Sequence, residues 1–312
     1  MRILPLILMV ACGPASGPVG SDPDTAWAPD PGWENDSVPT PRVLLDGLDE
    51  PAGLAVADGQ LWLAETGTGR IWVHDGREAS VWADGLDAPG RLAADGDGLV
   101  VQTLSQVLLL GEGEERILAE NPELPTEVAL GLDSIWWVDE GTGSDGEVWR
   151  ADRDGSGAVA VAVGLERPRG LALVGERAVV AETGNWRLIK VAPDRALEAL
   201  ATISGTVRDV AADCTSVVFA TESSRWPYPG FISTLDEGVE DRLSESPPQP
   251  ARILLTGDRV IWATKQSIHS IPREGGTLRT VVLRTNVADM LVSGDTLIWS
   301  DPERGAVLAV GL

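Results

Sequence analysis

Short apolar runs recur along the chain from residue 42 onward, and polar, glycine-rich turns separate them. Seven such runs, rich in β-branched and aromatic side chains, each follow a polar turn; they are residues 61–64, 99–101, 135–138, 178–181, 217–220, 260–263 and 297–299. An apolar run of this length without alternation is typical of a strand that is buried on both faces. The pattern therefore predicts sheets that pack against one another, with no amphipathic helices between them.

These runs belong to a longer internal repeat. The segment Leu-Asp-Gly-Leu-Asp-Glu-Pro-Ala-Gly-Leu-Ala at 45–55 is echoed at 83–93 and 163–172, and weaker copies start near residues 124, 205, 248 and 286. A spacing of roughly 36 to 44 residues is typical of four-stranded propeller blades. Seven copies predict an all-β fold over residues 42–312, a seven-bladed β-propeller of four-stranded antiparallel blades.

The two ends of this region complement each other. The last copy contains only three expected strands, near 287–292, 297–299 and 306–310, whereas the first folded segment, 42–48, matches the fourth strand of the other copies. We therefore expect the N-terminal strand 42–48 to complete the last blade. Such closure pairs sheet edges that would otherwise stay open.

The residues before the repeats resemble an export and anchoring signal. A short apolar run after Arg2, too short to span a bilayer, ends at Met9-Val10-Ala11-Cys12, which resembles a bacterial lipobox. The resemblance implies a signal peptide over 1–11, a lipid on Cys12 and, with Gly13 next, anchoring in the outer membrane of the bacterial envelope. Residues 12–41, rich in Gly, Pro, Ser and Asp, are expected to form a disordered tether. Cleavage elsewhere, as in an ordinary secretory signal, is the alternative.

The charge balance excludes one class of partner. The chain has 24 Lys and Arg against 48 Asp and Glu, a formal net charge of −24. That charge disfavours binding to nucleic acid or to anionic lipid, so membrane contact is expected through the lipid anchor alone. We expect a monomer.

Aromatic residues follow the strands. Nine of the ten tryptophans beyond the tether, all but Trp226, fall in expected second, third or fourth strands. Their large apolar rings are expected to pack between neighbouring blades.

Two motifs resemble known propeller repeats. Ala-Glu-Thr-Gly at 64–67 and 181–184 resembles NHL-type repeats, and Trp-Val-Asp-Glu-Gly at 137–141 is similar to the YWTD blades of lipoprotein-receptor propellers. The resemblance covers about residues 42–312. It implies the fold and leaves the function open, because propellers of these classes include adhesive scaffolds, lyases and lactonases.

Two rings of polar residues can be placed from the repeat alignment. The start of each first strand should point into the central channel, which gives a first ring of Gly53, Arg91, Glu127, Gly170, Asp209, Arg252 and Asp289. The ends of the second strands give a second ring of Glu65, Thr103, Asp139, Glu182, Thr221, Thr264 and Asp301. Charged groups avoid a dry interior unless they are paired or coordinated, so both rings are expected at a wet cleft or a metal site. The competing interpretation is that Arg91 and Arg252 neutralise the carboxylates in a structural network.

Two functions fit these rings. The first is a tethered, non-catalytic scaffold that binds a protein or glycan partner; loop 223–230, with Trp226 and Tyr228, has the composition of a binding hot spot. The alternative is a metal-dependent lactonase or other hydrolase similar to gluconolactonase-like propellers, with calcium held by Glu127, Asp209 and Asp289.

The match to that alternative is incomplete. That family mixes carboxylates with asparagines, and none of the asparagines falls at a ring position, while the ring arginines would repel a cation. His74 and His269, the only histidines, align with neither ring, so a histidine acid–base pair is missing. The acidic loop 139–147 is a further candidate for a structural calcium, or a solvated turn.

Overall fold

Strands are the only regular elements in the part of the chain that the structure describes. The computed structural model describes residues 38–312 except 97, 112–113, 121, 123, 223–229, 237 and 247–249. The expected signal peptide, Cys12, most of the tether and the aromatic residues of loop 223–230 lie outside the described residues. No helix that could cross a membrane occurs among the described residues.

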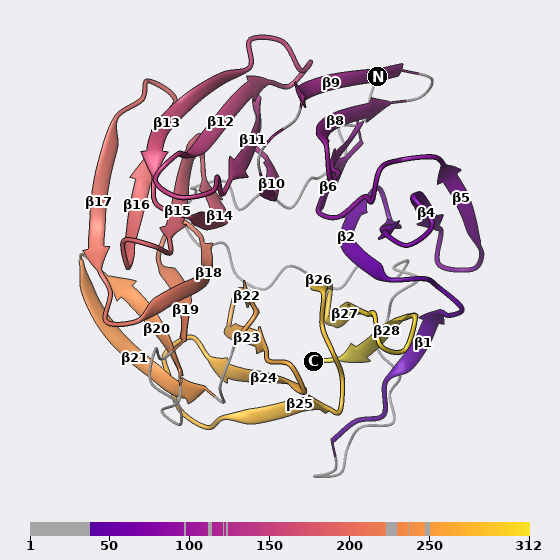
Figure 1. Cartoon of the computed structure of the whole chain (residues 1–312). Coiled ribbons are helices and arrows are strands. Elements are labelled where there is room, and N and C mark those ends of the chain that lie inside the picture. The colour runs from indigo at the N-terminus through magenta and orange to yellow at the C-terminus, as the bar shows by residue number, and fades with distance from the viewer. Residues whose placement is uncertain are drawn as a thin grey trace, which may run out of the picture.

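The strands form seven antiparallel four-stranded sheets around a central channel, as the repeats predict (Figure 1). Blade 1 contains β2 (Pro51–Ala57), β3 (Gln60–Glu65), β4 (Arg70–His74) and β5 (Ala79–Ala83), and blade 2 contains β6 (Leu92–Asp95), β7 (Gly98–Gln102), β8 (Gln106–Gly111) and β9 (Glu114–Glu120). Blade 3 contains β10 (Pro125–Leu130), β11 (Ser134–Asp139), β12 (Gly146–Asp152) and β13 (Val159–Leu165), and blade 4 contains β14 (Pro168–Val174), β15 (Arg177–Glu182), β16 (Arg187–Val191) and β17 (Leu197–Thr202). Blade 5 contains β18 (Thr206–Ala212), β19 (Val217–Glu222), β20 (Gly230–Asp236) and β21 (Val239–Ser246), and blade 6 contains β22 (Arg252–Leu255), β23 (Arg259–Ala263), β24 (Ser267–Pro272) and β25 (Arg279–Leu283). Blade 7 contains β26 (Asp289–Ser293), β27 (Thr296–Asp301), β28 (Ala306–Gly311) and β1 (Arg42–Leu45).

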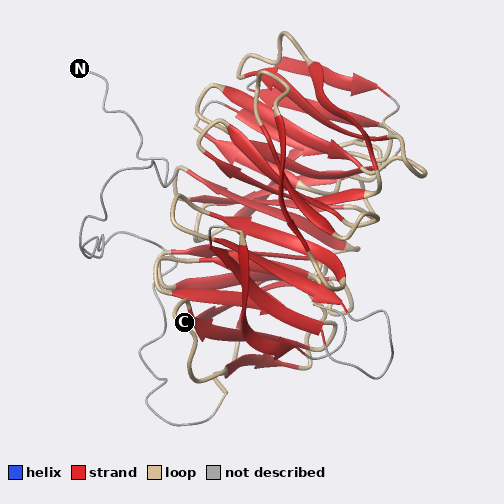
Figure 2. Cartoon of the chain, turned by 90° about the vertical axis from the view of Figure 1, so that its left-hand side faces the viewer, coloured by secondary structure: helices blue, strands red, loops and turns tan. Residues whose placement is uncertain are grey.

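Apolar side chains fill the space between the blades. One core cluster joins Trp136 and Val148 of blade 3 to Val180 and Ile189 of blade 4. The second strands supply the largest fully buried side chains, which include Trp136, Trp137, Trp262 and Trp299. The expectation that tryptophans pack between blades is confirmed for these residues, and Figure 2 shows the sheets side by side in the edge-on disk. Trp186 is an exception: it precedes β16 in a turn with a φ of 52° and is 57% exposed.

The N-terminal strand closes the ring in the expected place. β1 pairs with β28, with Arg42 opposite Ala309 and Val43 opposite Leu308. The strand ends at Leu45, before the expected limit at residue 48, although the Leu48 N–H still donates to the carbonyl of Gly305 at 2.9 Å. Leu44 and Leu45 pack against a core cluster shared by blades 7 and 1. Both ends of the chain therefore contribute to one sheet.

Removing β1 should destabilise the whole ring. A chain that lacks residues 42–45 exposes the edge of β28 and uncovers the cluster between blades 7 and 1, so we expect it to aggregate or to melt well below the intact protein. A chain that lacks residues 13–35 is the control and should melt as the intact protein does. Thermal unfolding followed by circular dichroism measures both; equal melting temperatures for the two deletions would contradict the closing role of β1.

Candidate functional site: the mouth of the central channel

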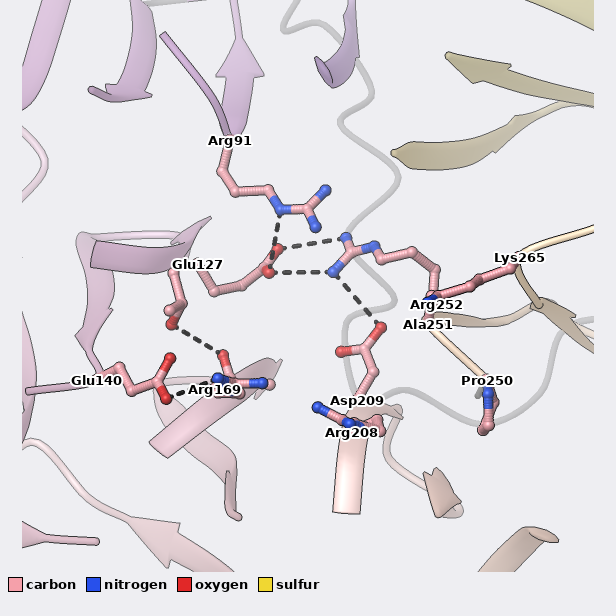
Figure 3. A pocket seen from close by; sticks show the side chains of 12 residues that line it. Arg91, Glu127, Glu140, Arg169, Arg208, Asp209, Pro250, Ala251, Arg252 and Lys265 are labelled. Atoms are coloured by element: carbon pink, nitrogen blue, oxygen red, sulfur yellow. Dashed lines mark hydrogen bonds and ion pairs between the residues drawn. The ribbon is translucent and has the colours of Figure 1, made fainter. Parts of the chain in front are cut away.

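The five charged residues of the predicted first ring meet at one end of the channel. Each one lies at or near the start of an innermost strand: Glu127 in β10, Asp209 in β18, Arg252 in β22, Asp289 in β26, and Arg91 just before β6. The innermost strands converge on the channel axis (Figure 1), so these side chains from five different blades reach one another. Figure 3 shows Arg91, Glu127, Asp209 and Arg252 pointing toward one another. The structure thus brings together the five charged residues that the repeat alignment placed in one ring.

The two arginines bind all three carboxylates. The guanidinium of Arg252 lies 3.0 Å from Glu127 Oε2, 3.4 Å from Asp209 Oδ2 and 2.9 Å from Asp289 Oδ1. Arg91 adds contacts of 3.0 Å to Asp289 Oδ1 and 3.5 Å to Glu127 Oε2. We call these five residues the mouth network. The structural-network interpretation of the first ring is thereby confirmed: the charges compensate one another across blades 2, 3, 5, 6 and 7.

The two aspartates of the mouth network also join neighbouring blades through the backbone. Asp209 Oδ2 accepts the N–H of Ile253 in blade 6 at 3.0 Å, and Asp289 Oδ2 accepts the N–H of Leu54 in blade 1 at 3.0 Å. The other carboxylate oxygen of each aspartate accepts a hydrogen bond within its own strand, from the N–H of Val210 to Asp209 Oδ1 and from the N–H of Met290 to Asp289 Oδ1. These carboxylates hold the ring together as well as balancing charge.

Burial and charge act against each other in this network. Burial raises the pKa of Glu127, and although Arg252 and Arg91 oppose that effect, the pKa stays above its usual value. For Asp289 the two arginines and the backbone N–H groups outweigh burial and lower the pKa. Burial disfavours the charged form of Arg252, but the three carboxylates raise its pKa well above normal. Burial thus dominates at Glu127, whereas the arginines and the backbone N–H groups dominate at Asp289.

The mouth network does not suit a calcium ion. Calcium requires six to eight oxygen ligands at about 2.3 to 2.6 Å. The carboxylates that would supply them, Glu127, Asp209 and Asp289, are each in contact with the guanidinium of Arg252, which occupies the place between them. Within the described residues no group of three or more His, Cys, Asp or Glu side chains could hold a metal, the acidic loop 139–147 included. We therefore derive no step through a metal.

The second ring lies inside the blades, away from the channel mouth. Its four carboxylates are almost fully buried. Each accepts a backbone N–H from the connection that enters its own blade: Glu65 from Asp49 at 2.7 Å, Asp139 from Leu124 at 2.8 Å, Glu182 from Glu166 at 2.9 Å and Asp301 from Asn286 at 3.3 Å. The threonines Thr103 and Thr264 bind the turn that follows them. The expectation that these carboxylates line a cleft is wrong for Glu65, Asp139, Glu182 and Asp301. Their side chains are buried and bind the backbone of the connections that lead into the blades.

A pocket opens on one side of the mouth network. It has a volume of about 440 Å³ and lies over the starts of the inner strands of blades 3 to 6 (Figure 3). Gly170 occupies the first-ring position between Glu127 and Asp209, and a Cβ there would lie 3.0 Å from Asp209 Cα. Close approach of the two strands therefore favours glycine at this position, and Gly170 forms part of the pocket wall.

Four charged residues of this pocket were missed in the sequence analysis. Arg169 and Arg208 directly precede the first-ring residues of blades 4 and 5, while Glu140 and Lys265 directly follow the second-ring residues of blades 3 and 6. The repeat alignment could have identified them, because they occupy the alignment positions next to those of the two rings. We did not expect these columns to reach the mouth, because alternate residues of a strand point to opposite faces.

Three of these four residues are paired. Arg169 Nη2 lies 2.8 Å from Glu140 Oε1, and Arg208 Nε lies 2.6 Å from Glu222 Oε2. The exposed Lys265 has no hydrogen-bond or ion-pair partner among the described residues. The Nε–H groups of Arg169 and Arg252 are buried and likewise lack a partner there. At the pocket itself, the ammonium group of Lys265 is therefore an exposed donor that the described residues do not satisfy.

Comparison with solved structures supports the fold. An inactive variant of virginiamycin B lyase from Staphylococcus aureus, determined with quinupristin, superposes with a TM-score of 0.74 at 12% identity, covering 88% of this chain and 98% of that one. A gluconolactonase from Xanthomonas campestris gives 0.56 at 15% identity, with 86% and 88% covered, and a chain of a nidogen–laminin complex gives 0.51 at 15%, with 64% and 80% covered. No protein-family model and no curated protein sequence matches the chain. Similarity at this level establishes a β-propeller, and the NHL and YWTD repeat types stay predictions.

The mouth network predicts an unusual pair of stability effects. Arg252→Met leaves three buried carboxylates facing Arg91 alone, which should cost about 3 to 5 kcal/mol of unfolding free energy. Adding Glu127→Gln removes one of those carboxylates, so the double variant should be more stable than Arg252→Met by about 1 kcal/mol or more. Urea unfolding of both variants measures the difference.

An exposed arginine provides the matched control for this pair. Arg77→Met, in the turn between β4 and β5, removes the same charge at the surface and should change stability by less than about 0.5 kcal/mol. A double variant that is less stable than Arg252→Met would show that Glu127 does not depend on Arg252 for its charge balance.

Proposed function

We propose that this propeller is a non-catalytic binding protein that receives its ligand at the mouth pocket. One observation carries the proposal: the channel carboxylates that would otherwise bind a catalytic metal are each paired with Arg252, while the pocket beside them is open and is lined by Lys265, which has no partner among the described residues. A rigid cavity within the size range of small-molecule sites, with a few converging polar groups, fits recognition.

The hydrolase alternative lacks the groups that its chemistry needs. Gluconolactonase-like chemistry requires a polarising cation, and the donor set at the mouth does not fit one. Neither histidine lines the pocket: His269 is buried in blade 6 with Nε2 2.7 Å from Ser267 Oγ, and His74 is buried in blade 1. We therefore do not assign to this chain the activities of the lyase and the gluconolactonase whose folds it shares.

The partner that fits this arrangement is a protein or glycan that presents a polar group to the pocket. Pro250 and Ala251, in the connection that enters blade 6, and Glu140 and Lys265, in turns that follow second strands, line the pocket. The sequences of these connections and turns vary between blades while the strands repeat. Such variation over a repeated frame suits recognition by several loops at once.

We also propose that the protein is a lipoprotein of the bacterial envelope, anchored through Cys12 in the outer membrane. The lipobox-like sequence before Cys12 and the Gly- and Pro-rich residues that follow it support this localisation. The chain has one other cysteine, Cys214.

Calcium and lactone experiments separate binding from hydrolysis. Titration of the purified protein with calcium should leave its melting temperature unchanged, and a panel of lactones should not be hydrolysed, because no cation can enter the mouth without displacing Arg252. A calcium-dependent stabilisation that disappears in Asp209→Ala or Asp289→Ala, together with lactone turnover, would overturn the binding proposal.

Mass spectrometry tests the anchor. Expression of the full chain in a Gram-negative host should give a membrane-associated product whose first residue is Cys12 and whose mass includes attached acyl chains. Cys12→Ser should release the protein from the membrane fraction, whereas Cys214→Ser should leave it there. A mature protein without acyl chains would overturn lipidation.

A further inference from the structure

The pocket differs in charge from the rest of the molecule. Its lining contains the cations Arg91, Arg169, Arg208, Arg252 and Lys265 and the carboxylates Glu127, Glu140 and Asp209, a net charge of +2. The whole chain, by contrast, has twice as many acidic as basic residues. Asp289 contacts Arg91 and Arg252 from outside this lining, and Glu222 contacts Arg208, so these two carboxylates offset the excess and leave the surroundings of the pocket neutral in an otherwise acidic protein.

Part of this positive charge is free to act on a ligand. The carboxylates of the mouth network balance Arg91 and Arg252, and Glu140 and Glu222 pair with Arg169 and Arg208, but the exposed Lys265 has no partner among the described residues. The Nε–H groups of Arg169 and Arg252 also lack a partner, but they are covered by protein and do not face the open pocket. Oxyanions carry several lone pairs and form short, strong bonds with charged donors, so they fit the ammonium group of Lys265 and the guanidinium group of Arg169 better than a neutral group does.

Lys265 is held at the pocket rim by a tight turn. The Thr264 N–H donates to the carbonyl of Ser267 at 2.8 Å, and the Thr264 hydroxyl contacts Ser267 Oγ at 2.9 Å. Lys265 follows Thr264 directly, so the turn presents its ammonium group beside Arg252 (Figure 3). The flexible lysine stem allows the ammonium group to follow a ligand, while Arg169 is fixed by Glu140.

We propose that the mouth pocket binds an oxyanion, a carboxylate or a phosphate, with Lys265 and Arg169 as its main contacts. This inference rests on the proposed binding function and specifies the chemistry of the polar group that the protein or glycan partner presents to the pocket. The volume of about 440 Å³ admits a group the size of an organic acid or a sugar phosphate, and it excludes a folded domain.

Calorimetry of the full chain with citrate, with inorganic phosphate and with neutral glycerol tests the proposal. We expect citrate, phosphate or both to bind, and glycerol not to bind; the relative affinity tells a carboxylate ligand from a phosphate ligand. Lys265→Gln should weaken binding of the better anion about tenfold, the size of one charge-assisted hydrogen bond. Added salt should weaken it further.

The only other lysine of the chain provides the control. Lys190→Gln, in β16, makes the same change of charge away from the pocket and should leave anion affinity as it is. The inference is overturned if neither anion binds, or if the two lysine variants bind equally. The proposed function fails separately, on calcium-dependent lactone turnover, so the two outcomes can be told apart.

Discussion

The contacts of Arg252 with three carboxylates are the interaction on which the channel mouth depends. Ring closure brings the starts of seven inner strands to one narrow opening, so whatever charges those positions carry must be balanced there. Arg252 reaches Glu127, Asp209 and Asp289 in blades 3, 5 and 7, and Arg91 reaches two of the same groups. Ion pairs in such a buried place offset the cost of removing each charge from water only when the geometry satisfies most of their hydrogen bonds. The additional N–H groups at Asp209 and Asp289 meet that condition.

The same crowding explains why the pocket lies on one side of the mouth. First-ring positions that carry long side chains fill the opening, whereas Gly170, which lines the pocket, adds no side chain between blades 3 and 5. Gly53 is the other glycine of the ring; a Cβ at either position would meet the backbone of the next blade, at Gly90 for Gly53 and at Asp209 for Gly170. Both glycines therefore allow two blades to come close together, and only Gly170 lies in the pocket wall.

The internal repeat allowed both the fold and the first ring to be predicted from the sequence. The blade number, the closure by the N-terminal strand and the meeting of Arg91, Glu127, Asp209, Arg252 and Asp289 all follow from aligning the copies. The second ring was misplaced because an alignment gives a position and not the partner of a side chain. Glu65 and Glu182 are bound by N–H groups 16 residues earlier, a contact that depends on how the connection folds back. The sequence did not predict Lys265 and Arg169 at the pocket, because they occupy alignment positions next to those of the two rings.

Charge placement, more than fold, decides what such a channel can bind. A carboxylate ring with open positions attracts a cation, which then polarises a substrate. Here the ring carries guanidinium groups at two of its seven positions, and they contact every carboxylate within reach. Among the described residues, the exposed donor that remains without a partner at the pocket is the ammonium group of Lys265, so the mouth can still bind a hydrogen-bond acceptor. A propeller built in this way selects the opposite sign of ligand from a metal-dependent one, even though its strands follow the same course.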